Sequence, residues 1–288
     1  MKPGVYTFNR NLYSLFFVLA LICCNNKKAD THKSSFDFAD ISQNSKKTLP
    51  TNNASSVQEG KYEYVISIPV PDDFARVEVQ ENSFGEYLRN FPLKQTDNIV
   101  YLYNGEQKWP QDIHIAVLKI DVGNRDLQQC ADAVMRLRGE YLYTRKKYDD
   151  IHFNFLSDGK PRYYKDHADS EFSYKSFRKY MDYIFSYANT ASLLKELKSV
   201  QLNDMKIGDV FIQKGNPYGH AIIVIDVAKH KVSGKKIFML AQSYMPAQEI
   251  HILKNLNDPG LSPWYNIDFG DELRTPEWNF RKEDLKRF

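Results

Sequence analysis

The sequence predicts an α+β fold, in which helices and an antiparallel sheet occupy separate stretches of one domain. Apolar residues recur at helical spacing from Leu127 to Tyr141, and a second helical region follows at 173–197. Beyond residue 205 the pattern changes to short apolar runs separated by Gly and Pro turns, which is typical of antiparallel strands. Helices followed by hairpins favour this class over a doubly wound one.

The elements before the first long helix are mixed. Alternation at 62–68 predicts a strand that Pro69 and Pro71 end. A short helix is expected at 84–90, and two more strands are expected at 99–103 and 113–120, with a turn at Asn104-Gly105.

The helix that follows Gly123 is the clearest in the chain. Asp126 and Gln129 are expected to form a capping pair, which places Cys130 close to the start of the helix. The region 173–197 is expected to break near Asn189-Thr190, and the polar, aromatic stretch 153–170 between the two helical regions is expected to be a loop or insertion.

Three strands are predicted next, at 207–212, 220–227 and 237–244. If the last two pair across a turn near residue 232, opposite residues have numbers that sum to about 464. His220 then lies opposite Tyr244 and diagonal to Gln242, and all three share one face of the sheet. An amide in that place can fix the tautomer and orientation of an imidazole.

The N-terminus predicts an exported lipoprotein. Lys2 and Arg10 precede an apolar run that is too short to span a bilayer, as in a signal peptide. The run ends in Leu21-Ile22-Cys23-Cys24, which resembles the bacterial lipobox, so the resemblance implies that Cys24 is lipidated. Cys23 is an alternative acceptor, and an ordinary signal peptide is the alternative to a lipobox.

This interpretation divides the chain into three parts: a signal peptide at 1–23, a lipidated Cys24 with a disordered polar tether at 24–60, and a single globular domain at 61–288. The expected location is the cell envelope, anchored to a lipid bilayer. Because no Asp follows Cys24, the resemblance favours the outer membrane over the inner one.

Composition and motif spacing limit the partners and cofactors that are expected. A net charge of +3 without a long basic run argues against a nucleic-acid partner. His114, His152 and His251 stand in similar settings, but none shows the spacing of a zinc motif, so neither a metal nor another cofactor is expected. Once Cys24 is acylated, Cys130 is the only thiol of the mature domain and can form no internal disulfide.

Three residues have the types that a cysteine hydrolase needs. Such an enzyme uses a thiol at a helix N-terminus, an imidazole that exchanges its proton, and a polar group that holds the imidazole. Cys130, His220 and Gln242 supply these types in chain order. The alternatives are a buried structural cysteine on the apolar stripe of its helix, a histidine satisfied within the core, and a strand-end amide that holds a loop. Asp209 is an alternative partner for His220.

Gly208-Asp209-Val210-Phe211-Ile212 and Gly219-His220-Ala221-Ile222-Ile223-Val224 resemble two strands of NlpC-type papain-like hydrolases, many of which cut peptidoglycan peptides. The resemblance covers about 126–244. It implies a papain-like core, in which a Cys-bearing helix packs on an antiparallel sheet, with the N-terminal strands added. Ala131 after the cysteine and the long Cys130 to His220 spacing depart from that pattern.

A resemblance over nearly the whole domain points to an uncharacterised lipoprotein family of Bacteroidota. It is carried by 126–132, 136–138, 241–248 and Thr275-Pro276-Glu277-Trp278. That family implies no activity.

The function expected from these observations is a thiol amidase or peptidase acting on cell-wall peptides. Cys130 is the nucleophile, His220 the base and then the acid, Gln242 the orienting residue, and the backbone N–H groups at the helix start form the oxyanion hole. Tyr244 and Trp264 are candidates to line a substrate groove. The alternative is a non-catalytic envelope lipoprotein of the same fold that binds wall material or a partner protein.

Overall fold

The computed structural model describes residues 58–288. The predicted signal peptide, Cys23, Cys24 and nearly all of the predicted tether lie outside the described residues. Residues 58–288 belong to one compact unit. No helix within them is long and apolar enough to cross a membrane.

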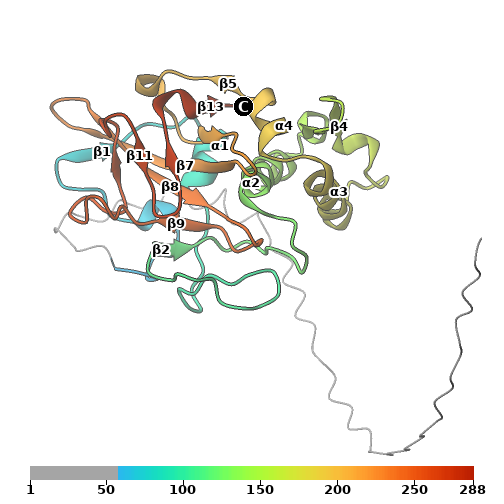
Figure 1. Ribbon diagram of the computed structural model, residues 1–288, viewed down its shortest axis with the longest axis horizontal. Coiled ribbons are helices and arrows are strands. Elements are labelled where there is room, and N and C mark those ends of the chain that lie inside the picture. The colour runs from blue at the N-terminus through green and yellow to red at the C-terminus, as the bar shows by residue number, and fades with distance from the viewer. Residues whose placement is uncertain (1–57) are drawn as a thin grey trace, which may run out of the picture. The chain divides into compact units, whose positions relative to one another are not determined.

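A large antiparallel sheet forms the centre of the domain (Figure 1), so the predicted α+β class is confirmed. Its strand order is β2-β9-β8-β7-β6-β13-β5, and β1 and β10 pair outside that path. The strands of this sheet are β1 (Phe74–Arg76), β2 (His114–Val117), β5 (Lys198–Ser199), β6 (Val210–Gln213), β7 (His220–His230), β8 (Lys236–Gln242), β9 (His251–Leu253), β10 (Tyr265–Asn266) and β13 (Leu285–Arg287).

The long strand β7 organises the sheet. One edge pairs with β8, while the other is shared by β6 near the start of β7 and by β1 near its end. Ile223 lies opposite Ala241, which is the predicted register, and a bulge between Val224 and Asp226 shifts the remaining pairs by one residue. The register is thus as predicted at the end of the hairpin that carries His220.

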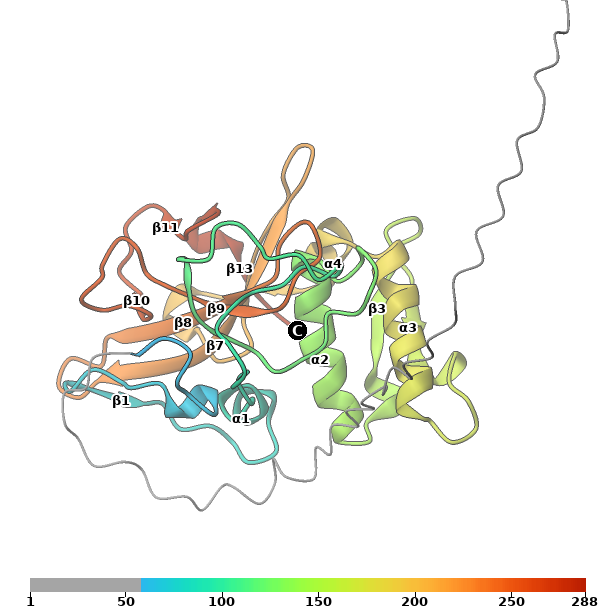
Figure 2. The same cartoon turned by 90° about the horizontal axis from the view of Figure 1, so that it is seen from below.

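Within residues 58–288, four α-helices accompany the sheet: α1 (Phe84–Arg89), α2 (Cys130–Thr144), α3 (Tyr174–Tyr187) and α4 (Thr190–Glu196). Helices α1 and α2 pack against β7, and α3 and α4 pack against α2. Figure 2 shows α2 between the sheet and α3. The predicted helix break is confirmed, because Asn189 caps α4 with its side chain after α3 has ended.

The remaining elements are short. Two small hairpins pair β3 (His152–Asn154) with β4 (Pro161–Tyr163), and β11 (Leu273–Arg274) with β12 (Asn279–Phe280). The stretch 153–170, predicted to be a loop or insertion, therefore holds part of a hairpin. The 3-10 turns are η3 (Val65–Ser67), η4 (Tyr148–Asp150), η5 (Tyr164–Asp166), η6 (Leu202–Asp204) and η7 (Lys282–Asp284).

Two predicted N-terminal strands are wrong. Residues 62–68 contain η3 instead, and only Tyr64 makes a bridge to another segment, at Pro92. Residues 99–103 make two isolated bridges, Tyr101 to Gln107 across the turn at Gly105 and Leu102 to the distant Gln248. The 62–68 segment makes local hydrogen bonds, such as Ile68 N–H to the Val65 carbonyl, whereas 99–103 bonds to the distant Ala247 and Glu249.

Candidate functional site

Cys130 is the first residue of α2, at the end of the helix nearest the start of β7. The cap differs from the predicted one, since Gln129 is the N-cap residue and forms a capping box with Asp132. The first-turn N–H groups of a helix lack intrahelical acceptors, so the thiol lies beside donors that no carbonyl of the helix accepts. Cys130 is only 6% exposed.

The thiol contacts two residues from other parts of the chain. Its Sγ lies 3.7 Å from Thr190 Oγ1, at the start of α4, and 3.8 Å from the Gly219 carbonyl oxygen. Because Gly219 directly precedes His220, the thiol lies beside the start of β7. Within residues 58–288, Sγ makes no hydrogen bond with the His220 imidazole.

Close packing before His220 depends on a glycine. A Cβ on Gly219 would lie 2.3 Å from the Gln213 carbonyl oxygen and 3.0 Å from Thr190 Cγ2. Such distances are shorter than van der Waals contacts allow. The absence of a side chain therefore lets β6, α4 and the thiol converge on this point.

His220 opens β7 and meets Gln242 across the sheet. Its Nε2 lies 3.0 Å from Gln242 Oε1, so the predicted contact between the two side chains is present. The Tyr244 ring packs at 4.8 Å between centroids and nearly edge-on, which agrees with the predicted opposition. Trp278 and Phe280 complete an aromatic wall around the imidazole, at 5.5 and 5.9 Å.

The site is neutral in its resting form. Burial lowers the pKa of His220 to about 4, although the hydrogen bond to Gln242 opposes this. Burial also raises the pKa of Cys130, and the hydrogen bond from Thr190 opposes that shift. Burial, Glu277 and then Cys130 raise the pKa of Tyr244, so its phenol also stays protonated. At neutral pH the site holds a thiol and an imidazole rather than an ion pair.

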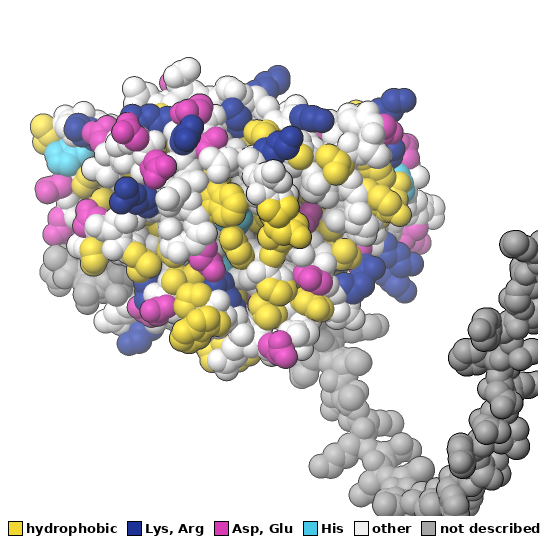
Figure 3. Space-filling view, viewed as in Figure 1, with side chains coloured by type: hydrophobic (Ala, Val, Ile, Leu, Met, Phe, Trp, Pro, Cys, Tyr) yellow, Lys and Arg dark blue, Asp and Glu magenta, His cyan; other side chains and the backbone are white. Residues whose placement is uncertain are grey.

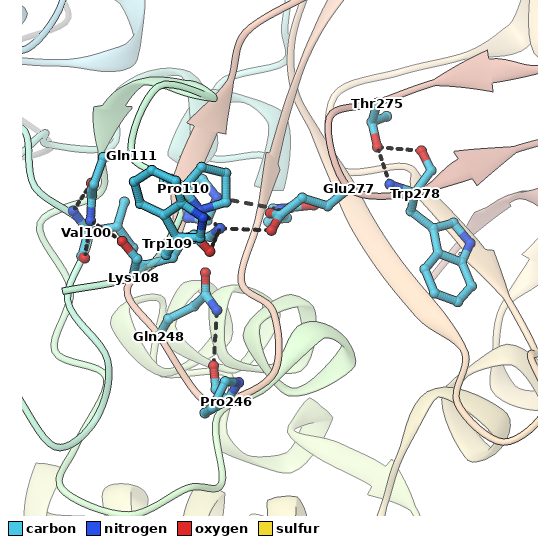
Figure 4. Close-up of polar contacts among 12 residues, drawn as sticks. Val100, Lys108, Trp109, Pro110, Gln111, Pro246, Gln248, Thr275, Glu277 and Trp278 are labelled. Carbon is cyan, nitrogen blue, oxygen red and sulfur yellow. Dashed lines mark hydrogen bonds and ion pairs between the residues drawn. The ribbon is translucent and has the colours of Figure 1, made fainter. Parts of the chain in front are cut away.

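Sequence reasoning missed three side chains behind Gln242. Gln242 Nε2 lies 2.6 Å from Glu277 Oε2 and 3.4 Å from His251 Nε2. Glu277 Oε1 in turn accepts a hydrogen bond of 2.7 Å from Lys108 Nζ, on a loop before β2 (Figure 4). The sequence carries no signal for this cluster, since Lys108 and Glu277 are 169 positions apart.

Two other predicted residues lie away from this cluster. Trp264 is 1% exposed and donates from Nε1 to the Pro69 carbonyl, so it belongs to the core and does not line a groove. The Asp209 carboxylate binds Arg287 of β13 at 2.6 and 2.8 Å and accepts from the Lys206 N–H. Asp209 therefore joins the segment before β6 to β13 and leaves Gln242 as the partner of His220.

The histidines at 114 and 251 form a buried pair, with ring centroids 5.5 Å apart. His152 instead lies on the small β3-β4 hairpin. Within residues 58–288, no group of three His, Cys, Asp or Glu side chains is arranged to hold a metal ion.

A cavity of about 550 Å³ adjoins the aromatic wall. Its lining includes Gln213, Glu277, Trp278, Phe280 and Arg281. Figure 3, which has the same view as Figure 1, shows hydrophobic side chains gathered near the middle of the visible face, close to where the sheet meets α2. Because Trp278 and Phe280 line both the cavity and the His220 ring, a ligand in the cavity would lie next to the aromatic wall around His220.

Comparison with known proteins identifies a family but no named relative. Neither the curated proteins nor the solved structures gave a match. One family model matches residues 66–169 and again residues 157–287. These ranges together cover most of the chain and include every residue of the site, from Lys108 to Trp278. The chain belongs to the family described as Domain of unknown function (4846).

Proposed function

We propose that the protein is a thiol amidase or peptidase with a papain-like site, in which Cys130 is the nucleophile and His220 the base. The supporting observation is the joint placement of three side chains. A cysteine opens α2, a histidine opens β7 beside it, and Gln242 on the next strand holds the histidine at 3.0 Å. This is the arrangement of roles that thiol hydrolysis requires.

The chemistry proceeds by general base catalysis from a neutral pair. His220 takes the proton from the Cys130 thiol as Sγ attacks the amide carbonyl, and the resulting imidazolium gives that proton to the leaving amine. The Cys130 and Ala131 N–H groups at the start of α2 stabilise the oxyanion. Water, activated by the same imidazole, then hydrolyses the thioester and releases Cys130.

The proposed substrate is a cell-wall peptide amide, and the proposed location is the cell envelope. This part rests on the resemblance to NlpC-type hydrolases and on the lipobox at Cys24. A chain tethered by lipid to the bilayer, in the outer membrane rather than the inner, meets peptidoglycan directly. Tyr244 and Trp278 beside His220 offer aromatic surfaces to such a substrate.

One observation favours a second candidate function. The Cys130 thiol is buried, and its hydrogen bonds go to Thr190 and to the Gly219 carbonyl rather than to His220. A thiol fixed in this way suits a non-catalytic lipoprotein that binds wall material or a partner protein. Catalysis therefore requires the thiol to turn from these acceptors toward the imidazole.

The full-length protein incubated with isolated peptidoglycan distinguishes the two candidates. Mass spectrometry would follow released peptides and new amino termini, with Cys130→Ala and His220→Ala as controls. A hydrolase releases peptides that both variants fail to release. If wild type and Cys130→Ala bind the peptidoglycan equally and release nothing, the binding function is correct.

A further inference from the structure

The Gln242 side chain is surrounded by groups that determine which way its amide points. Its Oε1 faces His220 Nε2, and its Nε2 faces both Glu277 Oε2 and His251 Nε2. Gln242, His220 and His251 are each at most 2% exposed, so water does not replace these hydrogen-bond partners. An amide can adopt the opposite orientation only if the neighbouring groups can exchange donor and acceptor roles.

Glu277 cannot exchange its role. Its other oxygen, Oε1, lies 2.7 Å from the ammonium of Lys108, which is 4% exposed. A carboxylate that is paired with an ammonium is ionised and only accepts hydrogen bonds. The amide nitrogen of Gln242, and not its oxygen, must therefore face Glu277. Figure 4 shows the Lys108 and Glu277 side chains meeting between their two loops.

His251 imposes the same orientation. Its Nδ1 lies 2.9 Å from the Glu249 carbonyl, which only accepts, so Nδ1 carries the proton. Burial, followed by the charge of neighbouring His114, lowers the pKa of His251 to about 3, so its ring is neutral and Nε2 is an acceptor. Both hydrogens of the Gln242 amide thus have acceptors, and Oε1 is left for His220.

We propose that Glu277 and Lys108 are positioning residues that act through Gln242 to hold His220 in its Nε2–H tautomer. Because Gln242 Oε1 only accepts, Nε2 of His220 must donate, and the lone pair of the neutral ring is on Nδ1. Nδ1 makes no hydrogen bond with any residue in 58–288 and is the nitrogen left to act as the base. This inference rests on the proposed function only for what Nδ1 does, and the tautomer is independent of it.

The substitution Glu277→Gln tests the proposal because it removes one acceptor. The new amide has a single oxygen for two donors, the Gln242 NH₂ and the Lys108 ammonium. Gln242 can then rotate, present its oxygen to residue 277 and its NH₂ to His220, and force the proton onto Nδ1. The lone pair of His251 Nε2 opposes this rotation, so the change is partial. The double substitution Lys108→Met with Glu277→Gln removes the competing donor and restores an acceptor to Gln242. Glu272→Gln, an exposed carboxylate that directly precedes β11, is the matched control.

The tautomer is read by ¹⁵N NMR of the histidine-labelled full-length protein, and base function by the rate at which p-nitrophenyl acetate acylates Cys130. We expect an Nε2-protonated His220 in the wild type and in Glu272→Gln. In Glu277→Gln we expect a partial change to Nδ1–H and an acylation rate at least about tenfold lower, since a positioned base contributes about 10²-fold or more. The double variant should recover both the Nε2–H tautomer and the wild-type acylation rate.

The possible failures are distinguishable. An Nδ1-protonated His220 in the wild type overturns the positioning role, whether or not the variants fold. A Glu277→Gln protein with the wild-type tautomer and rate also overturns it, as does a double variant no better than the single one. The remaining result combines two findings: His220 has the expected tautomer, which changes in Glu277→Gln, but acylation of Cys130 does not depend on His220. This result refutes the hydrolase function and leaves the positioning role correct.

Discussion

Acid should destabilise this protein through two buried histidines. The folded-state pKa values of His220 and His251 are about 4 and about 3, against an ordinary value of 6.5. Between pH 6.5 and these values the unfolded chain binds protons that the folded chain does not, so stability is complete above pH 6.5 and falls as the pH is lowered.

The size of the stability loss follows from the pKa of 6.5 that histidine has in the unfolded chain. At about pH 5, 1.5 units below 6.5, each histidine that stays neutral in the fold costs about 2 kcal/mol of unfolding free energy, or about 4 kcal/mol for the pair. His114, whose pKa is also lowered by burial, acts in the same direction. The loss is a large fraction of the stability of an ordinary domain.

Urea unfolding followed by circular dichroism, at about pH 7.5 and about pH 5, measures this loss. In His251→Gln the loss should be about 2 kcal/mol smaller, whereas His167→Gln, at an exposed position, should behave as the wild type. A wild-type loss below about 1 kcal/mol, or an equal loss in His251→Gln, would refute the assignment of these rings as buried and neutral.

Three further predictions concern single contacts. Asp226→Asn should lower the free energy of unfolding in urea by about 3–5 kcal/mol, since this fully buried carboxylate binds both Arg76 and Arg89. Asp268→Asn, in an exposed pair with Lys235, should lower it by under about 1 kcal/mol, and equal losses would contradict this prediction. Gly219→Ala should destabilise by about 1–3 kcal/mol and slow Cys130 acylation, because its Cβ would overlap the Gln213 carbonyl; an unchanged melting curve would contradict it. The rate of Cys130 acylation should stay level from about pH 7 to about pH 5 and fall with a midpoint near pH 4, the pKa of His220; a midpoint above pH 6 would show that the base is another group.

The sequence was sufficient for the hairpin that carries His220 and Gln242. Parity along a strand and the position of one turn determine which residues meet, and the bulge of β7 lies far enough from His220 to leave that end in register. Helix periodicity likewise predicted α2, but it placed the cap at Asp126, three residues before the Gln129 cap of the structure.

Other parts depended on contacts that no local pattern encodes. The 62–68 segment alternates like a strand, yet no neighbouring strand is placed to extend the pairing beyond Tyr64 in the described structure. Lys108 lies in no motif, and the segment Thr275-Pro276-Glu277-Trp278 assigned Glu277 no role. Their pairing becomes visible only when the two loops meet behind Gln242. Trp264 was expected at a groove, but its bulk fills the core beside Pro69.

Acylation of Cys130 in the full-length protein tests the catalytic assignment most directly. The wild type and His220→Ala would be treated with p-nitrophenyl acetate at neutral pH, and the Cys130 peptide would be quantified by mass spectrometry so that other cysteines do not interfere. A thiol activated by His220 is acylated in the folded wild type and at least about a hundredfold more slowly in the variant. A thiol that reacts at the same slow rate in both, and rapidly only in urea, is a core residue and contradicts the assignment.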